Sequence, residues 1–273
     1  MSDLVVGLST CPNDTFLFAP LLDGRVSTRG LALEFRLGDV EELNESLRAG
    51  SLAVSKASFA TALDLSDRYG VLPVGSALGF GVGPVLLGRP GVTTLPEDAR
   101  VLCPGAGTTA TLLLRALHPE VLRVEQRRFD RIMPALQSGE ADAGVCIHEG
   151  RFTYEQAGLP LLEDLGARWE RETGTPVPLG GLLARRDLDA DVLSRLVDCL
   201  RESLATARAD PQRCLPRMRE HAQELDDDVL WQHVELYVNE HTTDLGDLGR
   251  RCLGELAART GRPRAPLVLG DDG

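Results

Sequence analysis

One side chain stands out as a candidate ligand-binding group, because Lys56 is the only lysine in a chain of 273 residues. Of the 29 lysine and arginine residues, the other 28 are arginines. Lys56 sits in the apolar segment LAVSKASFA, where a lysine is usually paired or faces a ligand. A compact ammonium fits a small cavity and can bind a carboxylate or polarise a carbonyl. The alternative is a surface lysine without a function.

A second candidate is His148, which stands where the apolar segment AGVCI runs out into the polar sequence HEGRFTY. A neutral imidazole in that position can act as a general base near pH 7. A structural histidine with satisfied hydrogen bonds would give the same pattern. The other histidines have weaker contexts: His118 is at an expected helix end, and His221, His233 and His241 fall in polar C-terminal helices, where surface or packing roles are expected.

Two expected helix N-termini could add an anion-binding site. One opens near Asn13, Asp14 and Thr15, and the other opens near Thr108 and Thr109. The backbone N–H groups and the dipole of a helix N-terminus attract anions. Ordinary capping by Asn and Thr side chains explains the same residues, and the two roles are compatible.

A weak internal repeat indicates the fold. Residues 4–22 and 100–117 each read as a strand, a Cys-Pro turn and a helix, and the two Cys-Pro pairs are about 92 positions apart. A strand–helix–strand segment follows each unit, with Gly50 and Gly139 where its helix is expected to end. This alternation predicts an α/β protein with mostly parallel sheets and two similar lobes. Ligands of such proteins bind in the cleft between the lobes, outside the carboxyl ends of the strands.

The repeat also predicts where the candidate residues lie. Lys56 and His148 end matching strands of the two lobes, so both are expected at the mouth of the same cleft. The segment from 189 to about 260 has helix-period apolar positions and is expected to pack on lobe one. The expected boundaries are residues 1–88 plus 184–273 for lobe one and residues 89–183 for lobe two.

Composition narrows the class of partner. A net charge of -12 and a pI near 4.9 argue against nucleic acid or an anionic membrane as partner. No apolar run reaches the roughly 18 residues of a membrane span, and no signal-peptide pattern appears at the start, so a cytoplasmic protein is expected. The six cysteines lack metal-ligand spacing and are expected to be thiols. Without HExxH, GxGxxG, P-loop or GxSxG motifs, neither a metal nor an organic cofactor is expected.

Taken together, the motifs STCPNDTFLFAPL, SKAS, GTTAT, VCIHEGRFTYEQAGL, TGTPVPLGGLLARRDL and HVELYVNEHTTDLG resemble one family. From about residue 5 to residue 250, the chain resembles the 1,4-dihydroxy-6-naphthoate synthases of the futalosine route to menaquinone. The resemblance implies the two-lobed fold of the type II periplasmic binding proteins in a cytosolic enzyme. It also implies C–C cleavage of cyclic dehypoxanthinylfutalosine, a carboxylated spiro compound, without a metal or organic cofactor.

The resemblance further implies roles for individual residues. His148 corresponds to the general base of the family's IHE motif. The substrate-contacting Lys-x-Ser falls on Lys56, Ala57 and Ser58, and the Thr-Thr of the second helix opening falls on Thr108 and Thr109, followed by Ala110. Asn13 and Asp14 complete the expected substrate-binding set.

The alternative function is a non-catalytic binding protein of the same fold for a small carboxylate. A transport protein would need an export signal, and a ligand sensor would normally carry a helix-turn-helix. The sequence shows neither pattern, so the enzyme is the preferred interpretation.

Overall fold

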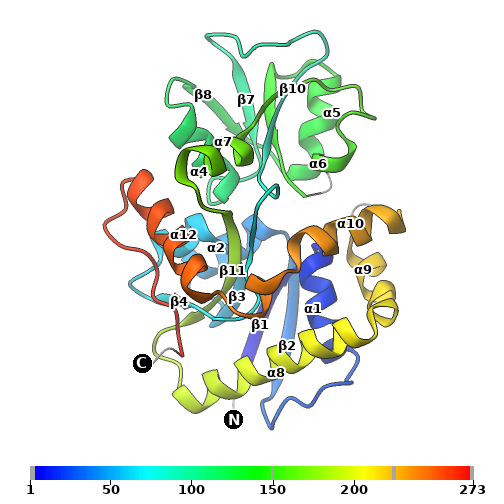
Figure 1. Ribbon diagram of the computed structural model, residues 1–273, viewed down its shortest axis with the longest axis vertical. Coiled ribbons are helices and arrows are strands. Elements are labelled where there is room, and N and C mark those ends of the chain that lie inside the picture. The colour runs from blue at the N-terminus through cyan, green and yellow to red at the C-terminus, as the bar shows by residue number, and fades with distance from the viewer. Residues whose placement is uncertain (1–3, 149, 223–225, 271–273) are drawn as a thin grey trace.

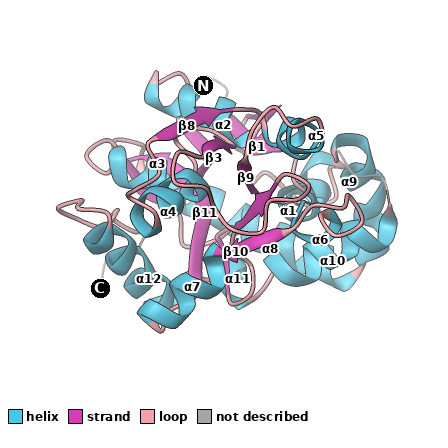
Figure 2. Ribbon diagram, turned by 90° about the horizontal axis from the view of Figure 1, so that it is seen from above, coloured by secondary structure: helices cyan, strands magenta, loops and turns pink. Residues whose placement is uncertain are grey.

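The computed structural model describes residues 4–148, 150–222 and 226–270. Two lobes lie one above the other in Figure 1, and each is built on its own mixed β-sheet covered by helices. The predicted two-lobed α/β fold is therefore confirmed. Figure 2, which looks down on the molecule from above, shows strands in the centre and helices around the outside.

The first sheet has six strands and carries the N-terminal part of the chain. Its order is β2-β1-β3-β11-β4, with β5 paired to β11. β1 pairs in parallel with β2 and β3, whereas β11 runs antiparallel to β3, β4 and β5. The strands are β1 Leu4–Ser9, β2 Leu33–Gly38, β3 Val54–Ser58, β4 Tyr69–Val71, β5 Ala77–Gly79 and β11 Val177–Arg185.

The second sheet has five strands and the related order β10-β6-β9-β7-β8. Here β7 pairs in parallel with β8 and β9, and β6 runs antiparallel to β9 and β10. The expectation of mostly parallel sheets is therefore wrong: four strand pairs are parallel and five are antiparallel, because the strands that cross between the lobes, β6 and β11, run against all of their neighbours. The strands are β6 Val85–Gly88, β7 Arg100–Cys103, β8 Arg123–Gln126, β9 Ala143–Cys146 and β10 Leu161–Asp164.

Sheet membership differs from the expected lobe boundaries at both crossings. Strand β6, residues 85–88, was assigned to lobe one but pairs within the second sheet, and most of β11, assigned to lobe two, pairs within the first. The backbone is closely packed just before β6, at the first crossing. A Cβ added at Gly83 would lie only 2.2 Å from the Cα of Gly166. The boundary was misplaced because an apolar strand reads the same whichever sheet it joins.

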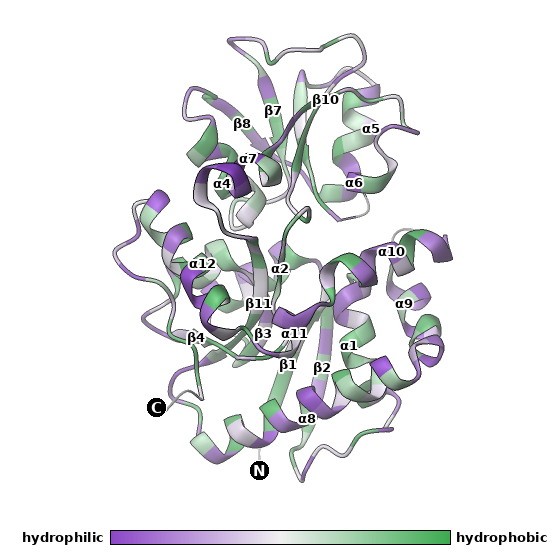
Figure 3. Ribbon diagram, viewed as in Figure 1, coloured by the Kyte–Doolittle hydropathy of each residue, from purple (hydrophilic) through white to green (hydrophobic). Residues whose placement is uncertain are grey.

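Helices cover the sheets, and those after residue 189 pack on lobe one as predicted, with α8 lying against α1. Figure 3 shows the inner strand β1 in hydrophobic colours and α8 in alternating bands, as expected for a helix with one buried face. The helices are α1 Pro12–Leu22, α2 Val40–Arg48, α3 Phe59–Asp64, α4 Thr109–Leu117, α5 Ile132–Gln137, α6 Gly150–Thr153, α7 Leu165–Thr173, α8 Ala190–Ala209, α9 Leu215–His221, α10 Asp227–Tyr237, α11 Glu240–Thr243 and α12 Gly246–Arg259, with 3-10 turns at Phe129–Arg131 and Pro211–Cys214.

The two lobes share one hydrophobic cluster behind the cleft. Leu113 of α4 and Trp169 of α7 come from the lobe-two segment, yet both are buried in the same cluster as Phe59 and Leu183 of lobe one. Each Å² of apolar surface that this cluster removes from water stabilises the contact between the lobes by about 25 cal/mol. None of the helices in the described ranges is long and apolar enough to cross a bilayer.

Candidate active site

A cavity of about 670 Å³, including its opening to solvent, lies between the lobes. All nine residues that the sequence analysis selected for the site line it: Asn13, Asp14, Lys56, Ala57, Ser58, Thr108, Thr109, Ala110 and His148. The structure therefore brings together residues from both halves of the repeat.

Lys56 was expected at the end of a strand, but it lies inside β3 and is only 5% exposed. Its Nζ forms an ion pair with Asp14 Oδ1 at 2.6 Å and donates to the carbonyl of Gly75 at 3.0 Å. Asp14 also accepts hydrogen bonds from Ser9 Oγ at 2.5 Å and from Asn13 Nδ2 at 3.0 Å. Because an ammonium has three N–H donors, these two bonds leave one donor for a ligand in the cavity.

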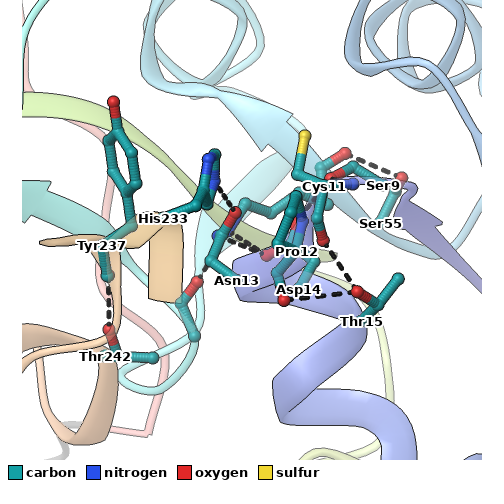
Figure 4. Close-up of polar contacts among 12 residues, drawn as sticks. Ser9, Cys11, Pro12, Asn13, Asp14, Thr15, Ser55, His233, Tyr237 and Thr242 are labelled. Atoms are coloured by element: carbon teal, nitrogen blue, oxygen red, sulfur yellow. Dashed lines mark hydrogen bonds and ion pairs between the residues drawn. The ribbon is translucent and has the colours of Figure 1, made fainter. Parts of the chain in front are cut away.

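The opening of α1 already contains a carboxylate. Cys11 is the N-cap residue, Pro12 is the first helical residue, and Asp14 lies in the first turn, where the helix dipole stabilises negative charge. The amides of Asp14 and Thr15 donate to the Cys11 carbonyl. An acidic side chain of the protein therefore already lies in the first turn at this end, and Figure 4 shows Asn13 and Asp14 within one polar network.

The opening of α4 is different. Thr108 caps the helix by accepting from Thr111 N at 3.2 Å, and the Thr109 hydroxyl donates to the Leu179 carbonyl of β11 at 2.7 Å. The backbone amides of Thr109 and Ala110 lie in the first turn, where a helix offers no internal acceptor. They border the cavity and can bind a carboxylate.

A carboxylate of lobe one contacts the turn before α4. Glu41 of α2 accepts a hydrogen bond from Gly107 N at 2.8 Å and lies 3.6 Å from Arg48. Its other oxygen accepts from Asn44 Nδ2, which also donates to the Ser58 hydroxyl at 3.3 Å. Hydrogen bonds through Glu41 and Asn44 of α2 therefore connect the contact between the lobes to Ser58 in the cavity.

His148 follows β9 and has a left-handed backbone, with φ +55°. Few residues other than glycine adopt this conformation, and it recurs at functional sites. The ring packs edge-on against Phe129, with centroids 4.9 Å apart. The Cys11 sulfur lies 3.5 Å from Nδ1 and 3.6 Å from Nε2, so the thiol sits midway between the two nitrogens. An imidazole and a thiol thus meet across the cleft.

The motif that carries His148 also holds lobe two to the crossing segment. Arg151 donates to the Gly83 carbonyl at 2.7 Å and pairs with Asp164 at 2.7 Å. Part of the HEGRFTY signature is therefore structural.

His233 is one of the residues that line the cavity without having been predicted there. His233 was assigned a surface or packing role, but it is 1% exposed and lines the cavity. Its Nε2 lies 3.0 Å from Asn13 Oδ1, and its ring lies 4.4 Å from Tyr237 and 6.1 Å from His148. Burial is the main reason that the pKa of His233 lies well below 6.5, with smaller contributions from His148 and Lys56. Figure 4 shows His233 beside Asn13 of the α1 network, with Tyr237 on the other side of the His233 ring.

A signal for His233 was present in the sequence. Leu230, Val234 and Tyr237 form the buried face of α10, and His233 has the helical spacing to join them. The expectation failed because the sequence does not show that this face covers the cleft.

The family of the chain follows from comparison with known proteins. A profile of the family described as menaquinone biosynthesis matches residues 4–262. The chain belongs to this menaquinone-biosynthesis family. A 1,4-dihydroxy-6-naphthoate synthase of Thermus thermophilus is 46% identical over 94% of both chains. One of Streptomyces coelicolor is 40% identical, over 98% of this chain and 96% of its own.

Solved structures with a similar fold include one related in sequence and one that is similar in fold alone. A protein of Archaeoglobus fulgidus, AF1704, is 30% identical and has a TM-score of 0.88 over 95% of this chain and 97% of its own. The ligand-binding component of a Staphylococcus aureus ABC-type import system has a TM-score of 0.70 at 16% identity, covering 98% and 96% of the two chains. The periplasmic-binding-protein likeness that the sequence predicted is thereby confirmed for the fold. In the part of the chain that the structure describes, no three His, Cys, Asp or Glu side chains converge as metal ligands.

Proposed function

We propose that this family member is a 1,4-dihydroxy-6-naphthoate synthase, an enzyme of menaquinone biosynthesis that cleaves cyclic dehypoxanthinylfutalosine. The observation that carries the proposal is one cavity with His148 on one wall and Lys56 on the other, in a chain 46% identical to a synthase of that name. The predicted class is a carbon–carbon lyase. A cytoplasmic location and independence from cofactors stay predictions.

His148 is the proposed general base. It removes a proton from a substrate hydroxyl, and the O–H electron pair forms a carbonyl as the neighbouring C–C bond of the spiro centre breaks. The electron pair of that bond passes into the ring that becomes aromatic, which supplies driving force. The left-handed backbone and the Phe129 contact hold the imidazole in place for this step.

The remaining cavity residues are proposed to bind and orient the substrate. The third donor of Lys56, the hydroxyl of Ser58 and the amides of Thr109 and Ala110 can hold carboxylate and hydroxyl oxygens. Ala57 lies between Lys56 and Ser58 and adds no bulk to the wall. Lobe closure would exclude water and align the bond to be broken.

The decisive experiment is turnover. The purified chain, treated with chelator, is incubated with cyclic dehypoxanthinylfutalosine, and 1,4-dihydroxy-6-naphthoate is followed by chromatography. Product formation is the expected result. Saturable binding without product would overturn the proposal and favour the non-catalytic small-carboxylate binding protein.

A further inference from the structure

The hydrogen bonds around Asn13 fix the tautomer of His233. The Asp14 carboxylate accepts from Lys56 Nζ at 2.6 Å, and Asn13 Nδ2 donates to the same oxygen at 3.0 Å. Asn13 therefore presents its carbonyl Oδ1 to His233. Because Oδ1 can only accept, the His233 Nε2 at 3.0 Å must carry the proton.

The other ring nitrogen of His233 is a buried acceptor. Burial, together with His148 and Lys56, keeps the pKa of this histidine well below 6.5, so the ring is neutral and Nδ1 bears only a lone pair. Nδ1 is buried and has no hydrogen-bond partner among the described residues. Native proteins seldom leave such an atom unpaired, and this one belongs to a residue that lines the ligand cavity.

We infer that His233 contacts the ligand, and that its Nδ1 accepts a hydrogen bond from a ligand hydroxyl. An atom with only a lone pair favours a hydroxyl and disfavours a carboxylate oxygen. The ammonium of Lys56 and the amides of Thr109 and Ala110 have the opposite preference. The site thus selects a hydroxylated carboxylate and fixes its orientation, with a hydroxyl toward α10.

This inference rests on the proposed function only for the identity of the ligand. His148 and His233 lie with ring centroids 6.1 Å apart, so the proposed base and this acceptor are close enough to contact the same part of the ligand. His233 would act as a positioning and specificity residue. The proton transfer itself belongs to His148.

Two variants test the roles of the two His233 ring nitrogens one at a time. In His233→Gln the side-chain amide can still donate to Asn13 Oδ1, but the acceptor at Nδ1 is lost. In His233→Asn an amide oxygen can replace Nδ1, but the donor to Asn13 is lost. His221→Gln, on α9 and outside the cavity, is the control. Equal melting temperatures for the variants and the control exclude misfolding.

Binding is measured by calorimetry with 1,4-dihydroxy-6-naphthoate and with 2-naphthoate, which keeps the carboxylate and lacks both hydroxyls. The wild-type chain should prefer the dihydroxy compound. His233→Gln should lose roughly tenfold in affinity for that compound and little for 2-naphthoate, as expected for one lost hydrogen bond. His233→Asn should recover part of the preference. A wild-type chain without the preference, or an equal loss for both ligands, would overturn the inference.

Turnover in the same preparation tests the proposed function separately. Retained preference without turnover would sink the synthase proposal alone, and turnover without preference would sink the role of His233 alone. Nitrogen-15 NMR of the imidazoles gives a second readout, with His233→Gln assigning the signal. The expected spectrum shows a neutral ring protonated at Nε2, whose Nδ1 signal moves when the dihydroxy compound binds. A proton on Nδ1, or an Nδ1 signal that ignores the ligand, would contradict the inference.

Discussion

The two related units β1–α1 and β7–α4 bring opposite electrostatics to the same cleft. In the first, Asp14 lies in the first turn of the helix and pairs with Lys56. In the second, Thr108 caps the helix, no acidic residue lies in the first turn, and Thr109 and Ala110 line the cavity. The same backbone arrangement therefore places a carboxylate of the protein at the start of α1 and leaves the start of α4 open to a carboxylate of the substrate.

The two cysteines of the repeat show the same divergence. Cys103 is fully buried, and burial raises the pKa of its thiol to about 12. Cys11 stands at the helix N-cap with its sulfur beside the His148 ring. Matching positions of a repeat can thus serve packing in one lobe and line the site in the other.

The largest expected effect comes from removing the proposed general base, His148. His148→Ala should lower kcat by about 10² to 10⁴-fold, the usual contribution of a general base. His221→Ala, outside the cavity, should leave kcat unchanged. Steady-state turnover of both variants checks this, and near-normal kcat in His148→Ala would refute the assignment.

Breaking the Lys56–Asp14 ion pair tests how much this pair contributes to the stability of the lobe-one side of the cleft. Lys56→Met leaves Asp14 buried without its partner and should lower the free energy of unfolding by about 3–5 kcal/mol. The double variant with Asp14→Asn should recover much of this, since the uncompensated charge is gone. Urea denaturation measures both.

Lys56 should also contribute to substrate binding. Lys56→Ala should raise KM for the substrate more than it lowers kcat, because its third donor is proposed to hold a substrate oxygen. An unchanged KM would count against a ligand contact by Lys56.

The stability of the chain should depend on pH through His233. Its pKa is about 6.5 when unfolded and lower when folded, so below pH 6.5 the unfolded chain binds the extra proton first. Stability is then constant above pH 6.5 and falls as the pH drops toward the folded pKa, by at most about 1.4 kcal/mol per pH unit. The difference between wild type and His233→Asn, measured in urea at pH 7 and pH 5.5, isolates this contribution. Equal slopes would contradict it.

The smallest effect is expected at the contact between Glu41 and the turn before α4. Glu41→Gln should weaken the bond from Gly107 N by about 1 kcal/mol and leave kcat nearly unchanged. Small-angle scattering of the ligand-free chain should then show a slightly larger radius of gyration. Glu45→Gln, on the exposed side of α2, is the matched control, and an equal change there would argue against a specific lobe contact.

Much of the site could be predicted because its residues lie in or directly beside repeated elements. Lys56 was conspicuous as the only lysine in an apolar strand, and His148 stood where an apolar strand met a polar loop. The pairing of Lys56 with Asp14 could not be read, because the two residues are 42 positions apart and meet only when β3 lies beside the start of α1. For the same reason the sequence showed two possible anion sites and could not show that a carboxylate of the protein pairs with Lys56 at one of them.

By itself, the sequence determined the alternation of strands and helices, the two lobes and the candidate residues Lys56 and His148 in or next to a strand of each lobe. These features are encoded locally, by apolar period, turn chemistry and repeat. Only the tertiary structure decided which sheet β6 and β11 join and that His233 reaches the cavity. Local patterns record whether a face is buried, but what it is buried against depends on contacts between segments distant in the chain. The proposed acceptor at His233 Nδ1 comes from that second kind of information.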